Sequence, residues 1–153
     1  MVAIRQILVP IDFSDPANAA LNYARSLAEE FGSHLHLFHV VPEPYIYPWG
    51  TEVPTLPLTD LLEQSETLSN ARLGELIPKD QAPKGGLTTS TAIGTPVDRI
   101  LDYINDSHID MVVMGTHGRG PVGHLLLGSV AERIVRRSPV PVLTVKGDAA
   151  PHH

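Results

Sequence analysis

The sequence predicts an α/β fold in which one open parallel β-sheet carries helices on both faces. Short runs of β-branched residues alternate with longer amphipathic runs along the chain, and this alternation is typical of such a sheet. The 153 residues suit a single domain that buries a core without disulfides, which a chain lacking cysteine cannot form. We expect right-handed crossovers between the strands.

The first two strands and helices have clear boundaries in the sequence. Residues 4–10 are predicted as a buried strand, and residues 14–31 as a helix with Ser14 as N-cap, Pro16 in the first turn and Gly32 after its end. Residues 35–41 are the second predicted strand. A helix over residues 58–77 is predicted to have a weaker apolar face, made of Leu61, Leu62, Ser65, Leu68, Leu73 and Leu76.

The remaining elements complete a five-stranded sheet. Residues 87–93 form a less apolar strand, expected near a sheet edge, and Thr95-Pro96-Val97-Asp98 starts a helix that runs to about residue 105. Residues 111–115 and 140–145 are the last strands, with a helix over 129–137 between them. The predicted domain spans residues 1–146, and residues 147–153 are expected to be a flexible tail.

Composition excludes several classes of protein. A formal net charge of −6 argues against nucleic-acid binding, and the local basic cluster of Arg133, Arg136 and Arg137 suits the last turns of a helix. No apolar stretch approaches the ~20 residues of a membrane span. The apolar run at residues 7–11 is too short for a signal peptide. We therefore expect a cytoplasmic protein with neither nucleic acid nor membrane as a partner.

The strongest functional signal lies between the fourth predicted strand and the last predicted helix. This connection holds five glycines, Gly115, Gly118, Gly120, Gly123 and Gly128. Glycines there let backbone N–H groups approach a ligand, and the helix adds its unpaired N–H groups and the positive end of its dipole. The segment predicts a phosphate site. Residues 118–123 match the G-x-G-x-x-G dinucleotide fingerprint, but they follow the fourth strand, whereas that fingerprint follows the first strand of its unit. A P-loop is rejected because its lysine is missing here.

Three candidate residues have a structural alternative to ligand binding. Ser129 begins a capping-box pattern with Glu132, so its hydroxyl can serve the helix as well as a phosphate. Arg119 can reach a phosphate or remain a solvated surface charge. Asp12 directly follows a buried strand, where it either accepts hydrogen bonds from a ligand base or sugar, or caps a helix or makes a turn with Ser14.

Residues 42–57 form a long connection that is rich in proline and aromatic residues. The prolines exclude a regular helix or a central strand, and a connection of this length is usually functional or mobile. It leaves the carboxyl end of the second strand, which is the edge where such sheets bind ligands. Three interpretations remain open: a surface loop packed on the domain, a flap over a ligand, or part of a dimer contact.

The sequence offers little for metal or hydrolase chemistry. His34 and His36 share one face of the second strand, and His117 and His124 flank the glycines, but their spacing matches no dedicated metal site. No G-x-S-x-G nucleophile elbow occurs, which argues against a Ser/His/Asp hydrolase. We therefore expect no metal bound by protein ligands and assign no catalytic residue.

Gly115, Gly118, Gly128 and Ser129 form a spaced motif. Two residues separate the first two glycines, nine separate the second and third, and the serine follows the third directly. Together with the flanking segments 110–115 and 137–145, the start at residues 7–14, His39-Val40 and the segment 94–100, this pattern resembles the universal stress protein family, specifically its ATP-binding branch. The resemblance spans nearly the whole chain. The combination is far more specific than any one of its glycine motifs.

The resemblance implies a Rossmann-like sheet of strand order 3-2-1-4-5, with ATP bound between the ends of the first and fourth strands. It implies that Asp12 and the backbone near Val40 meet the adenine, and that Pro10, Met114 and Gly115 line the base and ribose. The phosphates would be held by Gly118, Gly128, Ser129 and Val130, with His117 and Arg119 nearby. Family members commonly form homodimers through their last strands, which here comprise Val142, Leu143, Thr144 and Val145.

The leading functional hypothesis is a homodimeric, ATP-binding stress or signalling protein with little or no turnover. Mg²⁺ would bind through the phosphates, and a protein partner is left open. The alternatives are a slow Mg²⁺-dependent ATPase, or a dimeric binding module that uses the 42–57 connection without a nucleotide. The sequence departs from the family pattern at Pro121, which removes one N–H donor from the glycine-rich loop.

Overall fold

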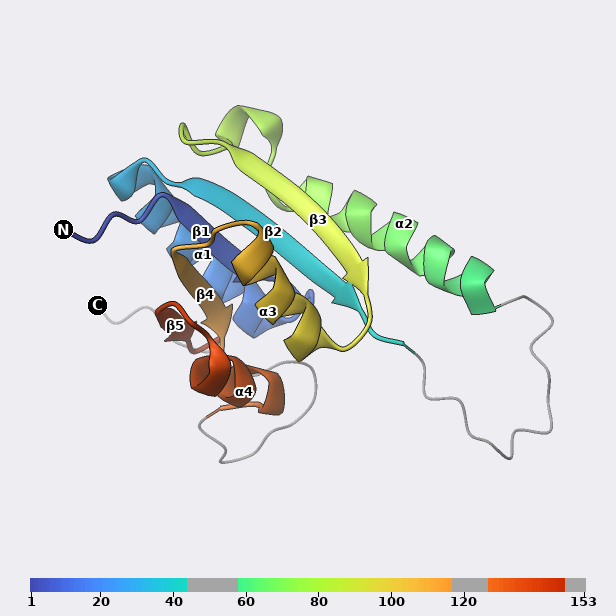
Figure 1. The fold of residues 1–153 in the computed structure, drawn as a ribbon. Helices are drawn as coiled ribbons and strands as arrows, with labels where there is room; N and C mark the ends of the chain where they lie inside the picture. Colours follow the sequence, from blue (N-terminus) through green and yellow to red (C-terminus); the bar gives the residue numbers. More distant parts are fainter. Residues whose placement is uncertain (44–57, 117–126, 148–153) are drawn as a thin grey trace.

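A computed structural model describes residues 1–43, 58–116 and 127–147 (Figure 1). Within these ranges the chain forms the strands β1 (Gln6–Pro10), β2 (His34–Val41), β3 (Leu87–Ile93), β4 (Met111–Gly115) and β5 (Val142–Val145). The helices are α1 (Asp15–Phe31), α2 (Leu58–Leu76), α3 (Pro96–Asp106) and α4 (Ser129–Arg137), with a short 3₁₀ helix, η1 (Lys79–Gln81), that the sequence did not predict.

The strands form one parallel sheet in the order β3-β2-β1-β4-β5, which confirms the predicted order and the edge position of β3. Leu8 of β1 pairs with His36 on one side and with Val112 on the other. From β1 the chain adds β2 and then β3 on one side of the sheet, and it then crosses to the other side of β1 to form β4 and β5. Strand order therefore reverses between β1 and β4, and in open α/β sheets ligands bind at such a reversal.

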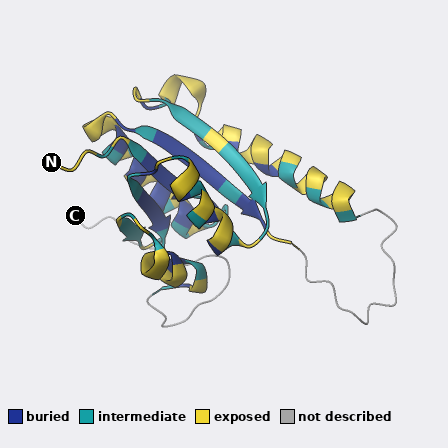
Figure 2. Ribbon diagram, in the orientation of Figure 1, coloured by how far each residue is buried: buried dark blue, intermediate teal, exposed yellow. Residues whose placement is uncertain are grey.

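The helices cover both faces of the sheet, as predicted. One buried cluster joins α1 and α2 to the face that carries Ile7, Val9 and Leu37, and a second joins α3 and α4 to the face that carries Leu8 and Phe38. Figure 2 shows burial concentrated in the inner strands, with exposed residues on the outer sides of the helices. Both faces of the inner strands are buried, which explains their nearly continuous apolar sequence.

The predicted ends of the first helix are confirmed. The Ser14 Oγ accepts a hydrogen bond from the Ala17 N–H at 3.3 Å, and Gly32 adopts the left-handed conformation with φ 66°. Strand β1 begins at Gln6, two residues later than predicted. The carboxylate of Asp110 accepts hydrogen bonds from the N–H groups of Arg5 and Gln6, both at 2.9 Å, just before the ladder begins.

The predicted apolar face of α2 is partly wrong. Leu61 and Leu68 are 37% and 66% exposed, whereas Ser69 and Leu73 are buried. Helix α2 packs against β2 and β3 at one side of the sheet, so only a narrow row of its residues faces protein. A serine in that row is a departure from an ordinary amphipathic pattern.

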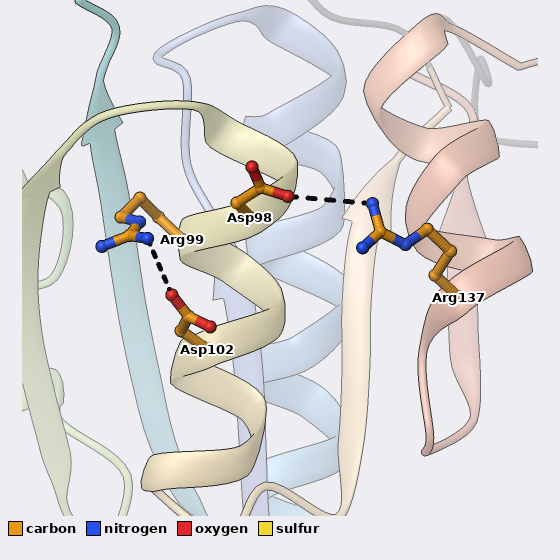
Figure 3. Close-up of polar contacts among 4 residues, drawn as sticks. All are labelled: Asp98, Arg99, Asp102 and Arg137. Carbon is orange, nitrogen blue, oxygen red and sulfur yellow. Dashed lines mark ion pairs between the residues drawn. The ribbon is translucent and has the colours of Figure 1, made fainter.

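Exposed ion pairs form within α3 and between α3 and α4 (Figure 3). Arg99 and Asp102 lie 2.9 Å apart on α3, and Arg137 of α4 reaches Asp98 of α3 at 3.7 Å. Arg136 and Arg137 occupy the last turn of α4, as predicted. Pairs this exposed contribute at most about 1 kcal/mol each, so packing rather than charge joins the two helices.

Candidate functional site

A cavity of about 700 Å³ opens at the carboxyl ends of the inner strands. Its walls come from the ends of β1, β2 and β4 and from the first turn of α4, with further residues from α2 and α3. It therefore lies at the reversal of strand order. Its size falls within the range of about 300–1,000 Å³ that is usual for small-molecule sites.

The cavity brings together the nucleotide-site candidates that lie in the described part of the chain. Its lining includes Pro10, Asp12, Val40, Met114, Gly115, Gly128, Ser129 and Val130. These residues come from four separate segments of the sequence. His117, Gly118 and Arg119, together with most of the 42–57 connection, lie outside the described residues.

Asp12 is held in place by the start of α1. Its Oδ1 accepts a hydrogen bond from the Ser14 N–H at 3.0 Å and a short one from the Ser14 hydroxyl. The expected turn with Ser14 is thus present, and Asp12 also lines the cavity. The two interpretations of this residue are compatible, because the turn with Ser14 and a place in the cavity lining are both observed for Asp12.

The first turn of α4 differs from the predicted capping box. Gly128 is the N-cap, no side chain caps this helix, and Ser129 is the first helical residue. The carbonyl of Gly128 accepts the Glu132 N–H at 2.9 Å, so the helix begins one residue before the pattern predicted. The predicted capping by Ser129 is therefore wrong, and its hydroxyl is not used as a cap.

The same turn presents backbone donors to the cavity. The Gly128 N–H donates to the carbonyl of Thr116 at 2.5 Å, which ties α4 to the end of β4. Within the described part of the chain, no partner is found for the N–H groups of Ser129, Val130 and Ala131. These three groups lie at the positive end of the helix dipole, where negative charge is generally favoured.

Gly115 has a packing reason to be glycine. A Cβ at this position would lie 2.7 Å from Pro16, at the start of α1, and a Cβ at Gly147 would meet the same proline at 2.5 Å. Pro16 therefore packs closely against the ends of two chain segments. This contact explains Gly115 without a ligand, although the residue also lines the cavity.

Sequence reasoning missed the part of the cavity that lies beside α2. Phe13, His39, Ser65, Ser69 and Arg72 line it, and we call this set the α2 lobe. The guanidinium carbon of Arg72 lies 3.8 Å from the centroid of the Phe13 ring, and the His39 ring lies 4.8 Å from the same centroid. The Nδ1 of His39 donates to the carbonyl of Ile11 at 2.6 Å. Of the three α2 residues in this set, Ser69 is buried, whereas Ser65 and Arg72 are exposed at the rim of the cavity.

His34 and His36 lie at the amino-terminal end of β2, in a network of hydrogen bonds. His36 contacts the Tyr103 hydroxyl through Nδ1 at 2.9 Å and Gln6 Oε1 through Nε2 at 2.7 Å, while His34 contacts the Gly85 carbonyl and Thr88. Burial, followed by the charge on His34, lowers the pKa of His36 to about 4. The two histidines thus support the fold.

The described ranges were also searched for metal and membrane features. No group of three or more histidine, cysteine or acidic side chains that could hold a metal ion occurs in these ranges. No helix in the same ranges is long and apolar enough to cross a bilayer. The cavity therefore remains the candidate site in the described structure.

Comparison with known proteins agrees with this architecture. The family model described as "Universal stress protein family" matches residues 3–146. A universal stress protein from Thermus aquaticus is 32% identical over 146 residues, covering 93% of this chain and 98% of the relative.

Two solved structures extend the comparison. The universal stress protein MJ0577 of Methanocaldococcus jannaschii has a structure that aligns with a TM-score of 0.77 at 25% identity, covering 99% of this chain and 100% of that one. A universal stress protein from Archaeoglobus fulgidus, solved in complex with dAMP, aligns with a TM-score of 0.54 at 22% identity, covering 95% and 100%, and shares the fold alone. On the family match and the Thermus relative, the chain belongs to the universal stress protein family.

Proposed function

We propose that this protein binds ATP in the cavity at the ends of β1 and β4 and acts as a nucleotide-dependent stress-response protein. The observation that carries the proposal is the convergence, in one cavity, of apolar walls, the carboxylate of Asp12 and the amino terminus of α4. Apolar walls with a few convergent polar groups are the usual composition of a small-molecule site. That a distant relative of the same fold was solved with dAMP is consistent with the proposal.

The base and ribose would occupy the part of the cavity between the ends of the strands. Pro10, Val40 and Met114 offer apolar surface there, and Val40 and Met114 are only 8% and 5% exposed. Asp12 supplies the acceptor for an amino or hydroxyl group, already oriented by Ser14. Buried apolar walls with a fixed acceptor favour a flat heterocycle that carries a hydrogen-bond donor.

The phosphates would be held at the first turn of α4. The N–H groups of Ser129, Val130 and Ala131 and the helix dipole all favour negative charge at this point. The Ser129 hydroxyl, which does not cap the helix, is a further donor. His117, Gly118 and Arg119 remain sequence-based candidates for the same phosphates, and Mg²⁺ would be bound through the phosphate oxygens.

The described part of the cavity favours binding over rapid hydrolysis. Its carboxylate, Asp12, accepts two hydrogen bonds from Ser14, and its imidazole, His39, donates to the Ile11 carbonyl. A general base must lie within hydrogen-bond reach of the attacking water, and the contacts given for these two side chains are to the protein itself. A slow ATPase remains the enzymatic alternative, with release of ADP and phosphate from the pure protein as its test.

Homodimerisation through β5 belongs to the same proposal. Strand β5 is an edge strand that pairs with β4 alone, and Val142, Leu143, Thr144 and Val145 all retain partial exposure in the single chain. An open apolar edge is a site of strand pairing with another chain. A second copy that pairs there would cover this edge.

Calorimetric titration of nucleotide-free protein with ATP and Mg²⁺ tests the proposal, with AMP and GTP as comparison ligands. We expect micromolar ATP binding that is weaker for GTP. The Asp12→Ala variant should weaken binding at the base and ribose, whereas Thr67→Ala, an exposed change on α2 outside the cavity, should leave it unchanged. An absence of ATP binding by the folded wild-type protein would refute the nucleotide function.

A further inference from the structure

His39 contacts the two residues that flank Asp12 in the cavity wall. It lies on β2, lines the cavity and belongs to the α2 lobe. Its Nδ1 donates to the carbonyl of Ile11 at 2.6 Å, and its ring centroid lies 4.8 Å from that of Phe13. The proposed nucleotide site uses Asp12 and gives His39 no role. One side chain thus joins the residues directly before and after the proposed ligand contact.

Ile11 is anchored through both of its backbone polar groups. The pairing of β1 with β2 ends at Pro10 and Phe38, so Ile11 lies just beyond it. The Ile11 N–H donates to the carbonyl of Phe38 at 2.8 Å, while the Ile11 carbonyl accepts from His39. Ile11 is only 3% exposed, and the backbone groups of buried residues need partners because water does not reach them. The His39 side chain therefore supplies a partner at the point where the chain leaves the sheet.

Phe13 has a strained backbone conformation. Its φ of 63° lies in the left-handed region, which a bulky residue seldom adopts and which persists only where the surroundings enforce it. The ring of His39 and the guanidinium of Arg72, 3.8 Å from the Phe13 centroid, both contact this side chain. Phe13 separates Asp12 from Ser14 in the chain. Its conformation therefore decides whether the Ser14 N–H reaches the Asp12 carboxylate, as it does at 3.0 Å.

We propose that His39 is a positioning residue, which fixes the turn of residues 11–14 so that the Asp12 carboxylate is held in the cavity wall before a nucleotide binds. The proposal rests on the ATP site proposed above. A group that is already ordered in the free protein loses less conformational entropy on binding, so the ligand binds more tightly. The hydrogen bond to the Ile11 carbonyl carries the effect, and the ring contact with Phe13 supports it.

Two substitutions separate the hydrogen bond of His39 from its ring contact. In His39→Asn the amide nitrogen takes the place of Nδ1 and can still donate to Ile11, whereas the ring is lost. In His39→Phe a ring remains against Phe13, whereas the donor is lost. The matched control is His34→Phe, at the amino-terminal end of the same strand. It also removes an Nδ1 contact with a backbone carbonyl, that of Gly85 at 3.1 Å.

Hydrogen exchange of the nucleotide-free proteins, followed by NMR, measures the positioning itself. The Ser14 N–H reports on the turn, because it donates to Asp12. We expect its exchange to be about threefold to tenfold faster in His39→Phe, as for one lost hydrogen bond. His39→Asn and His34→Phe should stay close to the wild type. Urea unfolding of the same proteins identifies any general loss of stability, which we expect in both phenylalanine variants.

Calorimetry with ATP and Mg²⁺ measures the consequence for binding. His39→Phe should bind ATP about threefold to tenfold more weakly, His39→Asn should recover most of the loss, and His34→Phe should bind like the wild type. The decisive comparison is made in the Asp12→Ala background. If His39 acts through Asp12, adding His39→Phe to Asp12→Ala weakens ATP binding no further.

Unchanged Ser14 exchange or unchanged ATP affinity in His39→Phe overturns the proposal. So does a loss that His39→Asn fails to restore, or a loss of the same size in the Asp12→Ala background, which is the result of a merely structural role. ATP binding that is insensitive to His39→Phe refutes the positioning role alone. A folded wild-type protein that binds no ATP refutes the nucleotide function, and the exchange of Ser14 then still decides whether His39 fixes the turn.

Discussion

Acidification should destabilise this protein through His36, and the size of the effect follows from its surroundings. His36 is 8% exposed, and its pKa is lowered to about 4 from 6.5, first by burial and then by the charge on His34. Because the pKa of His36 is lower in the folded protein than in the unfolded chain, protonation favours unfolding. The contribution of neutral His36 to the free energy of unfolding is therefore present above pH 6.5 and is lost as the pH falls toward 4. From these two values, the free energy of unfolding should fall by about 2 kcal/mol between pH 7 and pH 5.

The hydrogen-bond network explains why protonation is unfavourable. Nε2 of His36 faces the Gln6 Oε1, an acceptor, so the neutral ring carries its proton there and Nδ1 accepts from the Tyr103 hydroxyl. Burial raises the pKa of Tyr103, which keeps that hydroxyl protonated. A second proton on His36 would set the Nδ1–H against the Tyr103 hydroxyl, which donates to Nδ1 in the neutral form. It would also place a positive charge on a ring whose centroid lies 4.7 Å from that of His34.

Urea unfolding at pH 7 and pH 5 measures the effect, with His36→Asn as the variant that cannot titrate. His108→Asn is the control, because His108 is exposed and its φ of 51° is a conformation that asparagine tolerates. The wild type and the control should each lose about 2 kcal/mol more than His36→Asn between the two pH values. Equal losses in all three proteins would refute this account of His36.

Three further predictions concern the cavity, the packing of α1 and the sheet edge. Gly128→Val should weaken ATP binding, because Gly128 lines the cavity and valine adds a side chain there. The variant should keep its circular dichroism spectrum, because the Gly128 backbone angles, φ −70° and ψ 167°, suit any residue. Unchanged affinity would contradict the assignment of the phosphate site. Gly115→Ala should lower the free energy of unfolding by about 1–3 kcal/mol in urea, since its Cβ would lie 2.7 Å from Pro16, and a neutral result would show that this contact relaxes freely. Light scattering at tens of micromolar protein should give the mass of a dimer, and a monomer would argue against pairing through Val142–Val145.

Local sequence signals determined most of the secondary structure. Ser14 and Gly32 mark the ends of α1 because capping depends on a few adjacent backbone and side-chain groups. The run Met111–Gly115 forms a central strand because its apolar residues suit burial on both faces. The family, and with it the strand order, followed from a glycine spacing read together with its flanking segments.

The candidate site was only partly predictable. Asp12 and Ser129 lie far apart in the sequence, and the family resemblance, with the strand order that it implies, predicted that they share one site; both line the cavity. The helix bounds at residues 129–137 were predicted correctly, but the capping-box pattern at Ser129 was misleading, because Gly128 is the N-cap and its carbonyl accepts the Glu132 N–H.

The sequence by itself determined the alternation of strands and helices, the glycine-rich connection and the family, because these depend on neighbouring residues and on spacing along one chain. Only the tertiary structure decided that Gly115 packs against Pro16, that Arg72 stacks on Phe13 and that Ser69 lies buried on a cavity wall. The physical reason is that these contacts join residues from separate elements. Their distances are set by how the helices pack on the sheet, which no local pattern records.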